Sequence, residues 1–145
     1  MPIALPIQRL TKRSEFLFVR QGARASRGAV LIEARRRTED GQVRVGFTAS
    51  KKVGGAVQRN RARRRLREAA RQLLPEYGLP GVDYVLVARQ QTPDAPWAAL
   101  LDDVRNALIR LRADLEPGAA QGRGEKRAHT LSQSEFKGAQ RAKGD

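Results

Sequence analysis

The chain has 145 residues, a formal net charge of +14 and no cysteine. This length allows one domain with a hydrophobic core of ordinary size, and the lack of cysteine excludes disulfides and thiolate chemistry. The excess of basic over acidic residues indicates a polyanionic partner, with nucleic acid as the first candidate and an anionic membrane surface as the second.

Other classes are excluded by what the sequence lacks. No apolar run approaches the ~20 residues that a membrane span requires, and the opening MPIALPI is too short and too rich in proline for a signal peptide. The single histidine, His129, lies in a polar tail, so a cluster of histidine metal ligands is also excluded. These features predict a soluble, cytoplasmic protein.

The first half of the chain predicts an arm, a short helix and several strands. Residues 1–8 are expected to form an extended arm, and a helix is expected within 11–22, with Ser14 as its N-cap. Strands are expected at 24–27, 29–37 and 43–50, the last because apolar and polar residues alternate there. The Asp40-Gly41 pair favours a hairpin turn between the two longer strands.

The second half predicts two long helices around one buried strand. An arginine-rich helix is expected from Ala56 to about Leu74, where Pro75 and the glycines beyond it end the pattern. Residues 83–89 are almost wholly apolar, as in a central strand. Residues 97–115 carry apolar side chains at regular helical spacing.

The residues after the last helix are polar and basic, and they predict a disordered tail over 117–145. This tail is either passive or an auxiliary RNA contact made by Arg123, Lys126, Arg127, Lys137, Arg141 and Lys143. The predicted division is therefore an arm at 1–8, one domain at 9–116 and the tail. The element order predicts a single small α+β domain with helices packed on one mixed sheet.

The segment from Lys51 to Arg71 carries the strongest functional signal, with nine basic side chains and one acid, Glu68. Such like charge repels itself unless an outside anion offsets it. On a helical wheel an apolar arc docks on the sheet and most arginines point away, except Arg59 and Arg63 in the first turns. Guanidinium groups bind phosphate bidentately and stack on bases. The predicted RNA-binding residues are Lys51, Lys52, Arg59, Asn60, Arg61, Arg63, Arg64, Arg65, Arg67 and Arg71.

The stretch KKVGGAVQRNRARRRLRE resembles the RNR signature of the bacterial ribonuclease P protein component, with Arg59-Asn60-Arg61 as its core. The resemblance extends to Glu15-Phe16, to the strand that includes Arg44–Phe47 and to 83–89, and it covers roughly residues 9–115. Arg63 stands where this family often has lysine, which keeps the charge.

The resemblance implies a fold and a role. The fold is α-β-β-β-α-β-α around a four-stranded mixed sheet, with a left-handed βαβ crossover where the usual rule favours the right hand. The role is that of the protein subunit of a ribonucleoprotein endoribonuclease, whose RNA, with bound Mg²⁺, removes the 5′ leader from precursor tRNA. The expected partners are ribonuclease P RNA and precursor tRNA. A membrane, DNA, an organic cofactor, a protein metal site and catalytic protein residues are not expected.

The resemblance also implies that a cleft between the first helix and one sheet face holds the single-stranded leader. Such a cleft needs stacking faces and nearby cations. Phe16 matches the leader-contacting aromatic of the family, with a place in the core as the alternative, whereas Phe47 is expected in the core. The predicted leader-binding residues are Phe16, Phe18, Arg20, Ile32, Thr48 and Ser50. Many relatives have aromatic residues in place of Arg20 and Ile32, so cations are expected to replace part of the stacking.

Three other functions fit parts of the sequence. A protein nuclease would need clustered carboxylates or a histidine base, and the acids of the predicted domain are scattered. A structural ribosomal protein fits the composition, and only the signature argues against it. A DNA-binding regulator would use residues 56–74 for recognition, yet no helix precedes them to form a helix-turn-helix. The role of Asn60 stays open between orienting a phosphate, a base edge or a metal-bound water and fixing the helix start.

Overall fold

The structure is a computed structural model that describes residues 7–38 and 41–116. Its contacts divide the chain into two compact units, Met1–Arg112 and Ala113–Asp145. The described part of the second unit is the short stretch 113–116. Most of the predicted arm and the whole predicted tail lie outside the described residues, and the division into arm, domain and tail stays a prediction.

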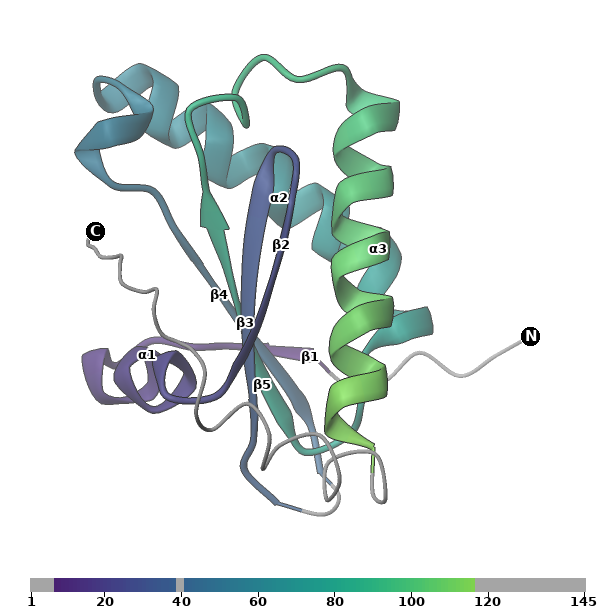
Figure 1. Cartoon of the computed structure of the whole chain (residues 1–145). Coiled ribbons are helices and arrows are strands. Elements are labelled where there is room, and N and C mark those ends of the chain that lie inside the picture. Colours follow the sequence, from purple (N-terminus) through teal and green to yellow (C-terminus); the bar gives the residue numbers. More distant parts are fainter. Residues whose placement is uncertain (1–6, 39–40, 117–145) are drawn as a thin grey trace. The chain divides into compact units, whose positions relative to one another are not determined.

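The described residues form an α+β fold with strands and helices in mixed order, as the sequence predicts (Figure 1). The elements are β1 (Ile7–Arg9), α1 (Arg13–Arg20), β2 (Ala23–Arg27), β3 (Val30–Arg36), β4 (Val43–Thr48), the 3₁₀ turn η1 (Lys51–Val53), α2 (Ala56–Tyr77), β5 (Val82–Ala88) and α3 (Trp97–Leu115).

The strands build one mixed sheet in the order β1-β4-β5-β3-β2. β5 occupies the centre, parallel to β4 and antiparallel to β3, which explains its almost wholly apolar sequence. Since β4 and β5 are parallel neighbours, α2 is the crossover that joins them.

Two expectations about the sheet are wrong. The sheet has five strands rather than four, because Ile7–Arg9 pairs in parallel with β4. Three residues are too few to show the alternation that marks a strand in sequence. The hairpin expected around Asp40-Gly41 does not form either, because β5 lies between β3 and β4. Gly41 still has the positive φ of a turn, at 117°. The sequence therefore indicated the turn correctly, but β3 and β4 do not pair with each other because each pairs with the apolar β5.

Helix ends also differ from the expectation in two places. α1 begins at Arg13, and its free amides are satisfied by Glu15 rather than Ser14: the Glu15 Oε1 accepts from the backbone N–H of Thr11 at 2.8 Å and of Lys12 at 2.9 Å. These amide donors lower the pKa of Glu15. α2 passes through Pro75 to Tyr77, because a proline near the end of a helix removes only one hydrogen bond.

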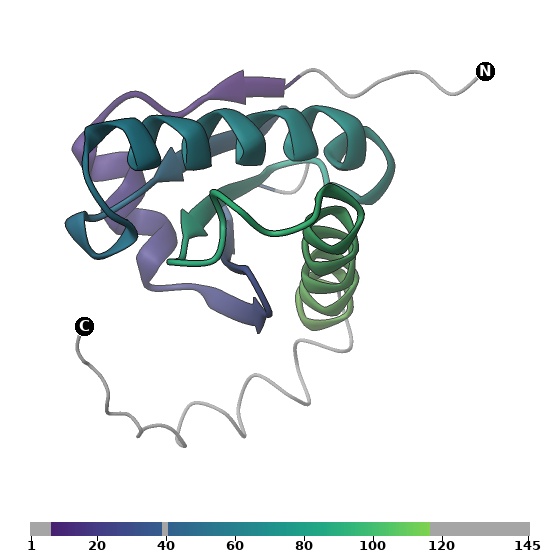
Figure 2. The same cartoon turned by 90° about the horizontal axis from the view of Figure 1, so that it is seen from above.

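The helices cover opposite faces of the sheet. Side chains alternate along a strand, and the ring of Phe16 on α1 lies against Gly46 while Arg67 of α2 lies over the ring of the next residue, Phe47. α1 therefore packs on the face that carries Val85, and α2 packs on the other (Figure 2). The buried residues of α2 are those of the predicted apolar arc: Ala62, Leu66, Ala69, Ala70, Leu73 and Leu74.

A buried carboxylate joins the central strands to α1. Asp83 in β5 is 0% exposed, and it accepts two hydrogen bonds from Arg44 in β4, at 2.9 and 2.7 Å. Arg37 donates to the same carboxylate at 2.7 Å, and Arg44 also reaches Glu15 of α1 at 3.1 Å. The hydrogen bonds to Asp83 raise the pKa of Arg44. This cluster fixes the register of β4 on β5 and the position of α1.

Replacing Arg44 by methionine should lower the free energy of unfolding by about 3 kcal/mol, because the buried Asp83 would keep only Arg37 as an ionic partner. Urea denaturation would measure the change. The control is Arg105→Met, which breaks an exposed pair with Asp102 on α3 and should cost less than about 1 kcal/mol. Equal losses in the two variants would contradict a special role for the buried cluster.

Candidate nucleic-acid interface

The predicted RNA-binding residues on α2 differ in what they contact. Arg59 and Arg63, which the helical wheel places on the apolar side, are half-buried in the first turns. Arg59 donates to the carbonyl of Gly54 at 2.9 Å, and Arg63 donates to the Oδ1 of Asn60 at 2.6 Å. These two arginines therefore stabilise the start of the helix, and Asn60 is part of that arrangement.

Arg61 and Arg65 hold the loop between β5 and α3. The Nε of Arg61 donates to the carbonyl of Pro93 at 2.6 Å. Arg65 donates to the carbonyls of Thr92 and Ala95, at 2.6 and 2.5 Å. Burial, with a smaller contribution from the charge of Arg61, lowers the pKa of Arg65. These guanidinium groups are thus fixed by the protein before any RNA arrives.

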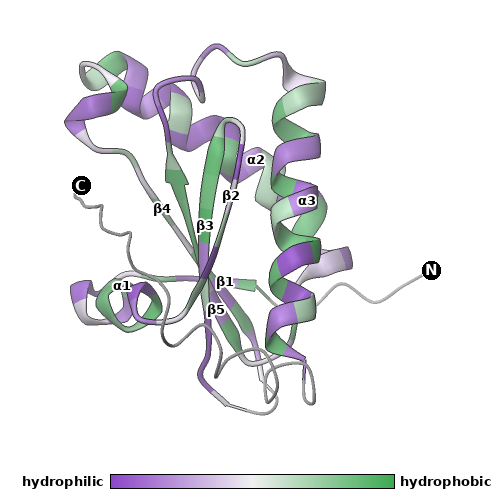
Figure 3. Cartoon of the chain, in the orientation of Figure 1, coloured by the Kyte–Doolittle hydropathy of each residue, from purple (hydrophilic) through white to green (hydrophobic). Residues whose placement is uncertain are grey.

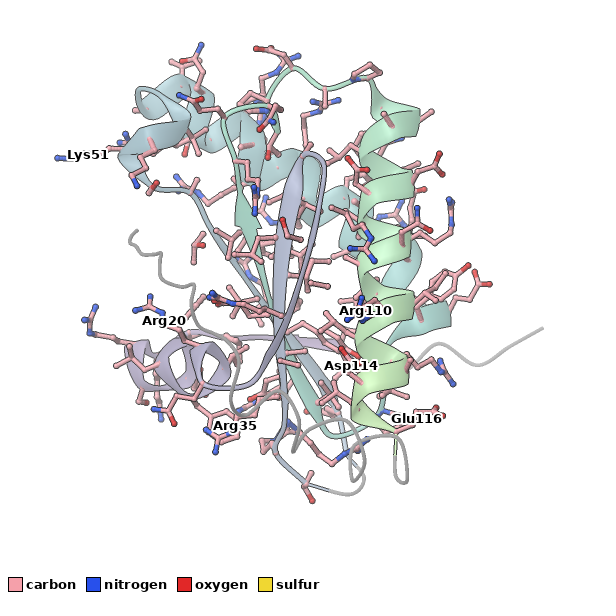
Figure 4. All side chains as sticks on the ribbon, viewed as in Figure 1. Arg20, Arg35, Lys51, Arg110, Asp114 and Glu116 are labelled. Atoms are coloured by element: carbon pink, nitrogen blue, oxygen red, sulfur yellow. The ribbon has the colours of Figure 1, made fainter. Side chains whose placement is uncertain are left out.

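The remaining basic side chains of this region face outward. Among the described residues, none forms a hydrogen bond or ion pair with the guanidinium of Arg64, and Arg67 lies 5.9 Å above the ring of Phe47. Arg71 is paired with Glu68, and this contact helps to lower the pKa of Glu68 to about 2. Lys51 points away from the ribbon at the loop before α2 (Figure 4).

Two hollows border the exposed Arg64. The first has a volume of about 290 Å³ and is lined by Arg61, Arg64, Arg65, Glu68 and Trp97. The second has a volume of about 410 Å³ and is lined by Val57, Asn60, Arg63, Arg64 and Arg67. The hydropathy colours show α2 as a largely hydrophilic helix (Figure 3).

The predicted RNA-binding set omits Val57 and Trp97, which line the two hollows. Val57 is 76% exposed among charged neighbours, and Trp97 is half-buried. Val57 could have been found from the sequence, because it is an apolar residue within the basic signature. Trp97 gave no such signal, because its spacing places it among the apolar residues of α3.

Part of the predicted leader surface lies on α1 and the sheet face beneath it. Phe16 packs on Gly46, and the guanidinium of Arg35 lies 4.1 Å from the ring centroid of Phe18. Arg20 is exposed on the same helix, and it lies with Arg35 near α1 in Figure 4. Thr48, half-buried, follows Gly46 on the same face of β4.

Two residues of the predicted leader set lie elsewhere. Ile32 is 0% exposed and pairs with Leu86 in the row that faces α2, so its side chain is not available to a leader. Ser50 is exposed beyond the end of β4, where its hydroxyl accepts from the N–H of Lys52 at 3.3 Å. The structure therefore brings together Phe16, Phe18, Arg20 and Thr48, and it separates Ile32 from them.

Comparisons with known proteins agree on one family. A family model described as Ribonuclease P matches residues 6–112. The ribonuclease P protein component of Caulobacter vibrioides (strain NA1000 / CB15N) is 55% identical over 121 residues, which cover 83% of this chain and 81% of that protein. The ribonuclease P protein component of Ruegeria pomeroyi is 53% identical over 107 residues, which cover 72% of this chain and 86% of that protein.

The chain belongs to the bacterial ribonuclease P protein family. It is the protein subunit of a ribozyme-based endoribonuclease and assists the RNA-catalysed removal of the 5′ leader from precursor tRNA.

Solved structures of the ribonuclease P protein family share the fold. The Staphylococcus aureus RNase P protein aligns with a TM-score of 0.61 at 23% identity, over 71% of this chain and 94% of that one. The Thermotoga maritima protein aligns with a TM-score of 0.59 at 24% identity, over 71% and 96% of the two chains.

The described part of the chain also lacks two features. It holds no group of three or more His, Asp or Glu side chains placed to bind a metal ion. It has no helix that is both long and apolar enough to cross a bilayer. The bacterial ribonuclease P family, to which the chain belongs, is Mg²⁺-dependent through its RNA.

Replacing Gly46 by alanine should displace Phe16, because a Cβ at position 46 would lie 2.5 Å from the phenyl ring. We expect the free energy of unfolding to fall by about 1–3 kcal/mol, as for other overpacked sites. Gly55→Ala is the matched control, since a Cβ there meets no atom within 4 Å. Thermal and urea denaturation would compare the two variants, and equal stability would show that Phe16 does not pack tightly on the strand.

Proposed function

We propose that this ribonuclease P protein uses two separate surfaces, one for the catalytic RNA and one for the substrate leader. The outer face of α2 binds ribonuclease P RNA, and α1 with its side of the sheet holds the 5′ leader. The observation that carries this proposal is the position of the exposed Arg64 between two hollows, on the face of the sheet opposite to Phe16 and Phe18.

The RNA-binding face follows from positive charge that has no ion-pair partner within residues 7–38 and 41–116. Arg64 and Arg67 are exposed, and Lys51 extends the same charge beyond the start of the helix. RNA phosphates would offset this charge and release counterions, which makes binding dependent on salt. Arg59, Arg61, Arg63 and Arg65 keep backbone or side-chain partners and border this face, and Lys52 and Arg71 lie at its two ends.

Asn60 fits a donor role in this surface. Its Oδ1 accepts from Arg63 at 2.6 Å, and the residue is exposed beside the second hollow. An amide whose oxygen is occupied still has two N–H donors. We propose that these donors bind a phosphate or a base acceptor of the RNA, and that the contact with Arg63 holds the amide in that orientation.

The leader surface combines an aromatic side chain with cations. Arg35 donates to the carbonyl of Phe18 at 3.2 Å and covers one part of its ring. Arg20 and Arg35 supply positive charge near the sugar–phosphate chain, and Thr48 supplies a polar contact on the sheet. Phe16 supports this surface from below, since it packs on Gly46. Ser50 would lie at the end of this leader surface. Ile32 is not part of the surface because its side chain is buried.

The chemistry remains with the RNA. We propose that Mg²⁺ is held mainly by the RNA subunit and that no protein residue is catalytic. In support, the carboxylates of Glu15, Glu68 and Asp83 are each held by arginine side chains. The protein would contribute positive charge and substrate positioning. We also propose a cytoplasmic location, no DNA or membrane partner and a left-handed β4–α2–β5 crossover. The basic residues after Pro117, which lie outside the described residues, are proposed as an accessory RNA contact.

A reconstituted reaction should depend on α2. With a bacterial ribonuclease P RNA, a precursor tRNA and low Mg²⁺, the protein should restore 5′ cleavage and should be inert alone. If it neutralises ~6 duplex phosphates, affinity should fall with salt with a log–log slope of roughly −5. Arg64→Ala combined with Arg67→Ala should reduce the size of that slope by about 2.

The control for this experiment is Arg110→Ala, which removes an exposed charge from α3 (Figure 4). It should leave the slope and the cleavage rate at their original values. A nearly flat salt dependence would contradict the phosphate-binding proposal. Tight RNA binding without restored cleavage would favour a structural RNA-binding role of the ribosomal type.

The leader surface makes a separate prediction. Phe18→Ala should weaken binding of leader-bearing precursor tRNA to the holoenzyme by about 1–3 kcal/mol, the usual contribution of one base–aromatic stack. Binding of mature tRNA should not change, because it has no leader. Leu17→Ala, an exposed apolar residue on the same helix, is the matched control. Equal effects on precursor and mature tRNA would show that Phe18 does not contact the leader.

A further inference from the structure

The hollow beside Trp97 has the chemistry of a nucleotide site. It lies between α2 and the first turn of α3, and its lining combines one indole ring with the guanidinium groups of Arg61, Arg64 and Arg65. Single-stranded RNA is bound in this way, with bases stacked on aromatic rings and phosphates held by nearby cations. The predicted RNA-binding set does not include Trp97.

The ring is held in place before RNA binds. The guanidinium of Arg65 lies 5.6 Å from the centroid of Trp97 and is itself fixed by the carbonyls of Thr92 and Ala95. Trp97 remains partly exposed. A rigid, partly exposed indole loses little conformational entropy when a base stacks on it, which favours binding.

The charge of the hollow favours a phosphodiester. Glu68 is the one acid in its lining, and its carboxylate already accepts from Arg71 and Gln72. Arg61 donates through its Nε to Pro93, and the same Nε lies 3.9 Å from the exposed carboxylate of Asp94. Its terminal NH₂ groups form no hydrogen bond within the described part of the chain. Arg64 is likewise available. A volume of about 290 Å³ lies at the lower end of small-ligand sites, which suits one nucleotide rather than a duplex.

We propose that this hollow binds one unpaired nucleotide of ribonuclease P RNA, with its base stacked on Trp97 and its phosphate on Arg61 and Arg64. The proposal rests on the RNA-binding role proposed for α2, because Arg64 borders both hollows. The precursor tRNA leader is the less favoured occupant, since the hollow lies on the α2 side of the sheet and Phe18 lies on the α1 side.

The chain offers a direct probe, because Trp97 is its one tryptophan. Fluorescence excited at the indole should be strongly quenched as full-length protein is titrated with ribonuclease P RNA, and acrylamide should then quench it less. Free tryptophanamide in the same RNA corrects for absorbed light. A subsequent addition of precursor tRNA to the complex should cause little further change.

Two variants test whether the ring contributes to binding. Trp97→Leu should weaken binding of ribonuclease P RNA by roughly 5- to 150-fold, the range expected for loss of one stacked base. Trp97→Phe keeps an aromatic face and should recover most of that affinity. Circular dichroism and denaturation of both variants separate a loss of stacking from a loss of fold.

The possible failures can be told apart. If the protein restores cleavage but Trp97 emission is unchanged in the saturated complex, the nucleotide site is absent and the role of α2 stands. If emission changes only when precursor tRNA is added, the occupant is the substrate and the proposal is overturned. If no RNA binds at all, the proposed function of α2 fails first. A folded Trp97→Leu protein with unchanged affinity would show that the ring only packs between the helices.

Discussion

The buried carboxylate of Asp83 is the constraint on which the arrangement of the surfaces depends. A charge with no exposed surface is stable only when it is fully paired, and here Arg37 and Arg44 supply the pairing. Because Arg44 belongs to β4 and also reaches Glu15, the same cluster aligns β4 with β5 and places α1 against the sheet. The parallel β4–β5 pair requires a crossover, and α2 is that crossover. The position of the basic helix therefore follows from the pairing at the centre of the sheet.

This arrangement separates two tasks that both involve RNA. A protein with a large positive charge attracts any polyanion, so charge alone cannot direct the catalytic RNA and the leader to different places. The sheet does so, because α1 and α2 lie on opposite faces of it. The faces also differ in chemistry. The α2 side presents guanidinium groups that suit phosphates, and the α1 side combines the Phe18 ring with cations that suit an unpaired strand.

Patterns that depend on neighbouring residues were predictable from the sequence. The apolar arc of α2 and the bounds of α3 follow from helical spacing, and both match the structure. Features decided by distant residues were not predictable. β1 is too short to show alternation, and the hairpin signal at Gly41 could not reveal that β5 would lie between its two strands. Ile32 was placed by resemblance to a family position, and its row in the sheet, opposite Leu86, is set by pairing that no local pattern contains.

The arginines of α2 also show why composition alone misjudges a binding surface. Arg61 and Arg65 look equivalent to Arg64 in sequence, yet each donates to loop carbonyls and thereby positions the start of α3. Lysine could keep their charge but not the planar, forked geometry with which Arg65 bonds two carbonyls and lies over Trp97. The preference for arginine in this segment thus has two physical causes, which are phosphate recognition by side chains that face solvent and hydrogen bonding to the carbonyls of the loop by the exposed Arg61 and the half-buried Arg65. The loop held by Arg61 and Arg65 also fixes the ring of Trp97, which borders the exposed Arg64. Loop bracing therefore helps to shape the surface that recognises phosphate.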